Sequence, residues 1–216
     1  MASVRIRYQT LEFGSTDIHL RTLRNKQQFC DTDNVAEGHG VSPASWPLFG
    51  VLWPSSQVLA HLMYEKNIEG LRILEVGCGL GLASHVLNHR LADITATDYN
   101  PEAGSFMKEN SRLNNCKPIP FSRAGWSDDK TNLGKFDLVI GSDLLYEPDH
   151  VDQLSSFIDA HAKDTCEVII VDPGRSLQAK FSNKMLSLGY RFNKSKPENT
   201  RFLEESFKGN ILVYAR

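Results

Sequence analysis

The sequence contains no hydrophobic run long enough to cross a membrane. A membrane-spanning helix needs about 18 consecutive apolar residues, and no stretch of the 216 residues approaches that length. Near the N-terminus, apolar and charged side chains alternate from Val4 to Arg7, so the apolar core of a secretory signal peptide is missing there. We therefore expect a cytoplasmic protein with no membrane contact.

A basic surplus is also lacking. The chain has 24 lysines and arginines against 26 aspartates and glutamates, which gives a formal net charge of -2. Proteins that bind nucleic acid through its phosphates usually carry an excess of positive charge. We therefore do not expect nucleic acid as a partner.

The metal-binding and disulfide patterns are absent as well. Cys30, Cys78, Cys116 and Cys166 are scattered and form no C-x-x-C pair, so we expect free thiols in a reducing cytosol. The two histidines within 85–89 are four positions apart, but neither a third ligand nor an H-E-x-x-H motif accompanies them. No metal ion is predicted.

What the sequence does contain is an alternation of apolar strand and helix patterns from residue 71 onward. Strands are expected over 71–76, 94–98, 119–122, 136–141, 168–171, 190–193 and 210–215. Helices are expected over 81–91, from Asn100 with Pro101 at its first position, over 151–162 and over 177–188. This order predicts an α/β fold with a doubly wound, mostly parallel, seven-stranded sheet. No helix separates the final two strands, so the last strand should be antiparallel.

The N-terminal part follows a different pattern. Alternating apolar residues on both sides of a turn over 14–17 predict a β-hairpin, and residues 30–50 read as a loop. A helix follows Trp53-Pro54, with Ser55 or Ser56 as its expected cap. We therefore divide the chain into an extension, 1–52, and an α/β domain, 53–216.

The strongest functional signal is the loop Glu75-Val76-Gly77-Cys78-Gly79-Leu80-Gly81, between a buried strand and a helix. Glycines there allow a sharp turn and a close approach to a ligand. Asp98 ends the next strand, where a carboxylate can accept hydrogen bonds from both hydroxyls of a ribose. Parallel strands bring both groups to the same edge of the sheet.

A dinucleotide site is the first alternative for this loop. Its fingerprint is G-x-G-x-x-G, whereas this loop is G-x-G-x-G, with Leu82 at the place of the third glycine. The negative charge of Glu75 disfavours a pyrophosphate but favours a sulfonium. The second alternative is a tight turn without any ligand. We favour S-adenosylmethionine as the cofactor.

With these motifs the chain resembles class I, seven-strand S-adenosylmethionine-dependent methyltransferases, from about Leu71 to the C-terminus. Within that class it is similar to methyltransferase family 16, the protein-lysine methyltransferases. Three features carry the narrower resemblance: Trp53-Pro54 before a helix, Trp126 soon after the third strand, and Asp143-Leu144-Leu145-Tyr146, a D-x-x-Y motif after the fourth. The expected cofactor-binding residues are Trp53, Glu75, Gly77, Cys78, Gly79, Gly81, Asp98, Tyr99, Asn100, Trp126 and Ser142.

The resemblance implies that Asp143 and Tyr146 are the catalytic residues. Methyl transfer is an in-line displacement that needs a well-oriented nucleophile with a free lone pair. Asp143 could hold a lysine ammonium in place, and Tyr146 could offer its ring face or its hydroxyl to the amine. Alternatively, Asp143 caps a turn and Tyr146 packs in the core. Trp53 and Trp126 could also be core residues.

The acceptor is the last question that the sequence raises. Enzymes that methylate adenine or glutamine amides typically carry N-P-P-Y or D-P-P-Y after the fourth strand, whereas Leu144-Leu145 stands in the middle here. We expect a protein side-chain amine, lysine first. The alternatives are a small-molecule or RNA methyltransferase, and a partner protein that binds the cofactor without catalysis.

Overall fold

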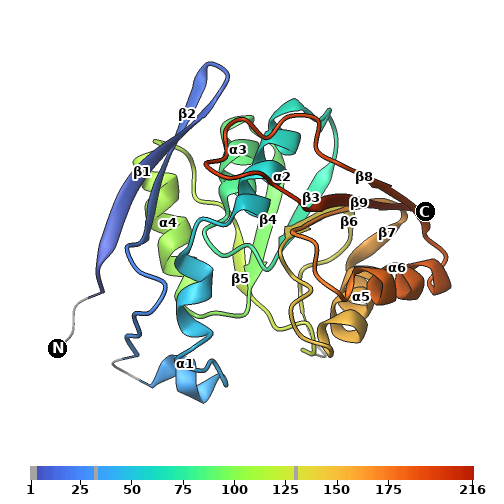
Figure 1. Ribbon diagram of the computed structural model, residues 1–216, viewed down its shortest axis with the longest axis horizontal. Coiled ribbons are helices and arrows are strands. Elements are labelled where there is room, and N and C mark those ends of the chain that lie inside the picture. The colour runs from blue at the N-terminus through green and yellow to red at the C-terminus, as the bar shows by residue number, and fades with distance from the viewer. Residues whose placement is uncertain (1–3, 32–33, 129–130) are drawn as a thin grey trace.

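The computed structural model describes residues 4–31, 34–128 and 131–216. A seven-stranded sheet forms its centre, in the order β5-β4-β3-β6-β7-β9-β8 (Figure 1). Its strands are β3 (Arg72–Val76), β4 (Asp93–Asp98), β5 (Phe121–Arg123), β6 (Phe136–Ser142), β7 (Ala162–Asp172), β8 (Arg191–Ser195) and β9 (Asn210–Ala215).

Strand direction agrees with the sequence-based prediction. The neighbouring pairs from β5 to β7 are parallel, whereas β9 is antiparallel to both β7 and β8. The chain builds outward from β3 toward β5, returns to β6 on the other side of β3, and continues from there. The carboxyl ends of β3 and β6 therefore flank the topological switch point, where ligands bind in open α/β sheets.

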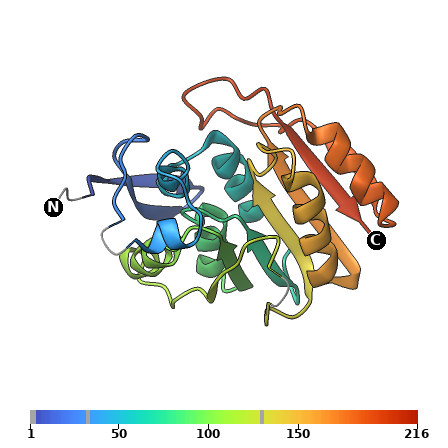
Figure 2. The same ribbon diagram turned by 90° about the horizontal axis from the view of Figure 1, so that it is seen from below.

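Helices cover both faces of the sheet because alternate strand residues point to opposite sides. On one face, Ile73, Leu138 and Ile169 share a core with α2 (Pro54–Glu65) and α3 (Leu82–His89). On the other face, Leu74 and Val139 share a core with two further helices. These are α5 (His150–His161) and α6 (Gln178–Ser187), which lie together in Figure 2.

The N-terminal hairpin consists of β1 (Ile6–Phe13) and β2 (Thr16–Leu23), joined by Gly14-Ser15. It docks on α4 (Ala103–Leu113) by an unusual contact. Two asparagine side chains of that region substitute for a neighbouring strand: Asn110 accepts from the backbone N–H of Arg21 at 2.7 Å, and Asn114 from that of His19 at 2.8 Å. The backbone N–H groups of His19 and Arg21, at the edge of β2, are thereby hydrogen-bonded.

Residues 34–53 contain more structure than the predicted loop. A short helix α1 (Val35–Gly38) and a 3₁₀ turn η1 (Trp46–Gly50) lie between the hairpin and α2. Trp46 and Phe49 pack with Phe106 of α4 in a small separate core. The domain boundary between residues 52 and 53 stays a prediction. Side chains from its two sides pack against each other, because Trp46 and Phe49 share a core with Phe106.

Two predicted helix starts are wrong in detail. Trp53 occupies the cap position of α2, and the hydroxyl of Ser56 donates to its carbonyl at 2.8 Å, so neither serine caps the helix. Helix α4 begins at Ala103, after a turn through Pro101. Strand β7 also begins six residues earlier than predicted, because its exposed first half carries no apolar pattern that could reveal it.

Candidate functional site

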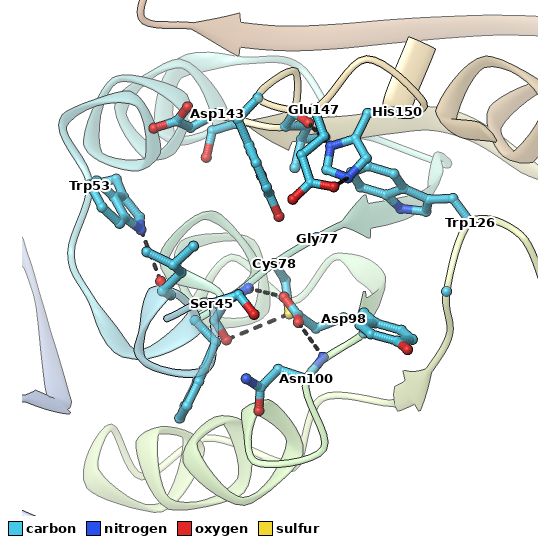
Figure 3. A pocket seen from close by; sticks show the side chains of 18 of the residues that line it. Ser45, Trp53, Gly77, Cys78, Asp98, Asn100, Trp126, Asp143, Glu147 and His150 are labelled. Carbon is cyan, nitrogen blue, oxygen red and sulfur yellow. Dashed lines mark hydrogen bonds and ion pairs between the residues drawn. The ribbon is translucent and has the colours of Figure 1, made fainter. Parts of the chain in front are cut away.

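A cavity of about 600 Å³ lies at the carboxyl ends of the parallel strands. In Figure 3, Asp143 and His150 lie on one side, Cys78 and Asp98 lie on the other, and a tryptophan stands at each end. The volume of this cavity falls within the range of about 300–1,000 Å³ that small-molecule sites occupy.

The glycine loop after β3 forms the floor of the cavity. Gly77, Gly79 and Gly81 have φ angles of 58°, 55° and 64°, a conformation that L side chains rarely adopt. At Gly79 a side chain would also clash, because an added Cβ would lie 2.8 Å from the carbonyl oxygen of Phe49. The glycine therefore lets η1 close over the loop.

Asp98 connects the end of β4 to this loop. Its Oδ2 accepts from the backbone N–H of Gly79 at 2.7 Å, and its Oδ1 accepts from that of Asn100 at 2.8 Å. Burial raises the pKa of Asp98, while those backbone hydrogen bonds act in the opposite direction. Each oxygen keeps a lone pair for the cavity, so the carboxylate suits two neighbouring hydroxyl donors.

Glu75 does not line the cavity. Its side chain leaves β3 on the same face as Ile73 and lies beneath the start of α3, where it accepts from the backbone N–H of Ser84 at 2.9 Å and from the Ser84 hydroxyl. That N–H is one of the donors that a helix start leaves unsatisfied. Glu75 thus positions the helix that follows the loop, rather than touching a ligand directly as we expected.

Burial raises the pKa of Glu75 to about 7, against the opposing effect of the Ser84 hydrogen bonds. The folded protein therefore holds this proton up to a higher pH than the unfolded chain, and Glu75 reduces stability as the pH rises from about 4.5 to about 7. We expect Glu75→Gln to flatten the dependence of Tm on pH across this window, measured by thermal unfolding. Glu69→Gln, at an exposed position, is the control. If the slope of Tm against pH were unchanged in Glu75→Gln, the raised pKa of Glu75 would be contradicted.

The segment before α2 supplies one wall. Asn100 donates to the carbonyl of Trp46 at 3.0 Å, and the indole N–H of Trp53 donates to the carbonyl of Leu48 at 3.0 Å. The Nζ of Lys26 lies 5.0 Å from the Trp53 ring centroid. Trp53 is half-buried at the cavity wall rather than in the core.

An aromatic row forms the opposite wall. The ring centroid of His150 lies 4.9 Å from that of Trp126 and 4.5 Å from that of Tyr146, both nearly perpendicular. The Nδ1 of His150 contacts the carbonyl oxygen of Leu144 at 2.8 Å and must carry the proton there, because a carbonyl only accepts. This contact fixes the ring between the D-x-x-Y loop and Trp126.

Asp143 and Tyr146 both face the cavity, and neither matches the alternative reading as cap and core residue. Asp143 has a φ angle of 57°, and its Oδ1 lies 2.5 Å from the Nε of Arg175. Tyr146 is 46% exposed. Burial, with a further contribution from nearby carboxylates, raises the pKa of Tyr146 to about 12, so its hydroxyl keeps its proton at neutral pH. The Leu144 and Leu145 side chains between them are buried.

The structure gathers every predicted site residue except Glu75 around one cavity. Sequence reasoning missed Phe49, Glu147, His150 and Arg175, which also line it. Arg175 was detectable in principle, because Pro173-Gly174-Arg175 follows β7 at the same edge of the sheet. Burial raises the pKa of Cys78 well above its usual value, which disfavours a thiolate nucleophile there.

Sheet order, switch point and glycine loop together define a Rossmann-like fold of the class I methyltransferase type. A 16S rRNA N2 methyltransferase of T. thermophilus shares this fold, with a TM-score of 0.68 and 12% identity over 99% of this chain and 51% of that chain. A family model for lysine methyltransferases matches residues 47–187. The chain therefore belongs to this family, methyltransferase family 16.

Two relatives show the range of the similarity. The electron transfer flavoprotein β subunit lysine methyltransferase of Xenopus laevis is 30% identical over 145 residues, which cover 65% of this chain and 57% of the relative. A histone-arginine methyltransferase of the same species is 30% identical over 104 residues, 45% of this chain and 44% of the relative. The chain thus spans about half the length of these relatives.

Proposed function

We propose that this protein transfers methyl groups from S-adenosylmethionine to a lysine side chain of a protein acceptor. One observation carries the proposal: a single cavity joins the glycine loop and Asp98 to the D-x-x-Y residues Asp143 and Tyr146. Membership of a lysine methyltransferase family supports it.

The residues present fit this cofactor. Asp98, with lone pairs facing the cavity, suits the two ribose hydroxyls, and Trp126 offers a flat surface for the adenine. Among the described residues, three carboxylates line the cavity, Asp98, Asp143 and Glu147, against one guanidinium, that of Arg175. This acidic surplus suits a cation. When bound, S-adenosylmethionine supplies a methyl group on a positively charged sulfur, which an amine with a free lone pair can accept.

The chain's own residues must orient that amine. Asp143 can accept an N–H hydrogen bond, and the protonated hydroxyl of Tyr146 can donate one. Both follow β6 at the switch point, and Asp143 lies across the cavity from the glycine loop (Figure 3). Orientation of this kind is the main demand that an in-line displacement makes on a protein.

We also propose that the protein acts in the cytosol. Cys78, Cys116 and Cys166 are free thiols, as a reducing compartment allows. Separately, no helix of the described residues is long and apolar enough to cross a membrane.

Cofactor choice is tested by calorimetry. We expect S-adenosylmethionine and S-adenosylhomocysteine to bind and NAD not to bind, because the loop lacks the third glycine of a dinucleotide site and the cavity is acidic. Tight NAD binding without an S-adenosylmethionine signal would refute the proposal.

Acceptor class is tested by labelling. The pure protein and radiolabelled cofactor are incubated with cell extract treated with protease, with nuclease or with neither. We expect the label to be protease-sensitive and to be recovered as methyllysine after hydrolysis. Methylarginine, a nuclease-sensitive label or a labelled small molecule would each show that the acceptor is arginine, nucleic acid or a small molecule instead of lysine. Cofactor binding without any labelled acceptor would favour a non-catalytic partner protein.

A further inference from the structure

Arg175 is the one lysine or arginine among the described residues that line the cavity. Its Nε lies 2.5 Å from the Oδ1 of Asp143, whose side chain is 12% exposed. Its guanidinium carbon lies 5.7 Å from the ring centroid of Tyr146. A positive charge thus already stands against both residues at which the acceptor amine is expected.

A network of buried polar groups holds the loop that carries Arg175. Asp172 is fully buried at the end of β7, and its Oδ1 accepts from the backbone N–H of Gly174 and of Arg175, each at 2.7 Å. The side chain of Gln178, at the start of α6, donates to the same oxygen and accepts in turn from Asn210 at 3.3 Å. Three elements therefore fix the backbone of this loop, from which the Arg175 side chain, 38% exposed, reaches Asp143.

Among the described residues that line the cavity, only Asp143 forms an ion pair with this charge. The buried Asp172 carboxylate lies outside the lining and accepts from backbone N–H groups of the same loop. Asp98, on the opposite side, is engaged with backbone N–H groups, and the neighbouring Cys78 is a neutral thiol. Glu147 is exposed and has its Oε2 3.6 Å from the Nε2 of His150. Among the described residues of the lining, the remaining titratable ones are Tyr99 and Tyr146, and those from 40 to 56 are all uncharged.

We propose that Arg175 makes the acceptor end of the cavity select a lysine side chain in its uncharged form. This inference rests on the proposed function and deepens it. A lone carboxylate would bind lysine as an ammonium, which has no lone pair for attack. Because Arg175 neutralises Asp143 and repels a second cation, the ammonium is disfavoured and the free amine is preferred. Asp143 can still accept an N–H of that amine and orient its lone pair.

Selection of the free amine matters because very few lysine side chains are uncharged near neutral pH. A lysine amine has an ordinary pKa of about 10.4, so only about one molecule in a thousand is uncharged near neutral pH. A neighbouring cation disfavours the ammonium form and so lowers the pKa of an amine. Each unit by which Arg175 lowers this pKa raises the uncharged, reactive fraction about 10-fold.

The test uses n-butylamine, a minimal lysine side chain, and needs no turnover. Its dissociation constant is measured by NMR titration at pH 7, 8 and 9 on the protein saturated with S-adenosylhomocysteine, which lacks the sulfonium charge. For the wild-type protein we expect affinity to rise about 10-fold per pH unit, in step with the free-amine fraction.

Arg175→Gln should lose most of this pH dependence and bind the probe at pH 7 at least about 10-fold more tightly than wild type, as butylammonium on the unpaired Asp143. Arg175→Lys, which keeps the charge, should retain the wild-type dependence. Arg191→Gln, at an exposed position on β8, is the matched control and should behave as wild type. All four proteins should bind S-adenosylhomocysteine alike and melt within a few degrees of one another.

Wild-type binding that is independent of pH, or an equal pH dependence in Arg175→Gln, would overturn the inference. The titration is repeated without S-adenosylhomocysteine, so that the role of Arg175 is decided by the same comparison of variants even if the cofactor fails to bind, a failure that would refute the proposed function. Conversely, protease-sensitive methyllysine in extract together with pH-independent butylamine binding would uphold the function and refute the selection of the free amine.

Discussion

Asp143→Asn should slow methyl transfer by roughly 100-fold, the loss expected when a group that positions the nucleophile is removed. Asparagine keeps the size and most of the hydrogen bonding of aspartate, and it tolerates the left-handed backbone found at position 143. The backbone N–H of Asp143, which donates to Val171 at 2.9 Å, should therefore stay in place. What disappears is the negative charge and with it the ion pair with Arg175.

Cofactor affinity should change little in this variant, because the loop after β3 and Asp98 lie on the opposite side of the cavity. Single-turnover rate, calorimetric affinity and Tm are measured on the same preparations. Asp149→Asn, an exposed carboxylate at the start of α5, controls for loss of charge on the same segment and should leave the rate unchanged. Full activity of Asp143→Asn, or a loss of Tm with normal turnover, would reduce Asp143 to a structural residue.

Tyr146→Phe separates the contribution of the Tyr146 ring from that of its hydroxyl. The ring contacts His150 and stands near Arg175, and phenylalanine preserves those contacts. A mild effect would assign the function to the ring face, whereas a loss as severe as that of Asp143→Asn would assign it to the hydroxyl.

Asp98→Ala should weaken cofactor binding by about 1.5–3 kcal/mol, the range for hydrogen bonds to a charged group. This corresponds to roughly 10- to 150-fold in the dissociation constant. The carboxylate serves both as the expected ribose acceptor and as the acceptor for the backbone N–H groups of Gly79 and Asn100. Its loss therefore also loosens the turn that shapes the site.

The fold should survive this substitution, because the two released N–H groups face an open cavity where water can replace the carboxylate. Calorimetry and thermal unfolding check the two effects separately. Asp93→Ala, at the exposed opposite end of the same strand, should leave cofactor affinity unchanged. An unchanged dissociation constant in Asp98→Ala would show that another group holds the ribose.

Much of the architecture could be predicted because its signals are local. The apolar runs of β3 and β6, the glycines at 77, 79 and 81, and the helical spacing in α6 each depend on near neighbours in the chain. The parallel arrangement follows from the alternation of those elements. The site could be predicted for the same reason. Asp98 ends β4 and Asp143 directly follows β6, and the carboxyl ends of these strands meet at one edge of the sheet.

Glu75 shows where that reasoning stopped. Its place in the sequence, two positions before Gly77, suggested contact with a cation. The pleat of β3 turns its side chain to the face of Ile73, under α3, where Ser84 satisfies it. The two-residue period of a strand contains this information, but which face α3 covers is decided by the tertiary structure.

The sequence by itself determined the strand and helix order, the glycine loop and the placement of Asp98, Asp143 and Tyr146 at one edge, because backbone conformation and strand ends depend on short-range patterns. Only the tertiary structure decided that η1 closes over Gly79 and that Arg175 pairs with Asp143. These contacts join residues about 30 positions apart. No periodicity encodes such a pairing; it arises from how the layers pack and from the balance of buried charge.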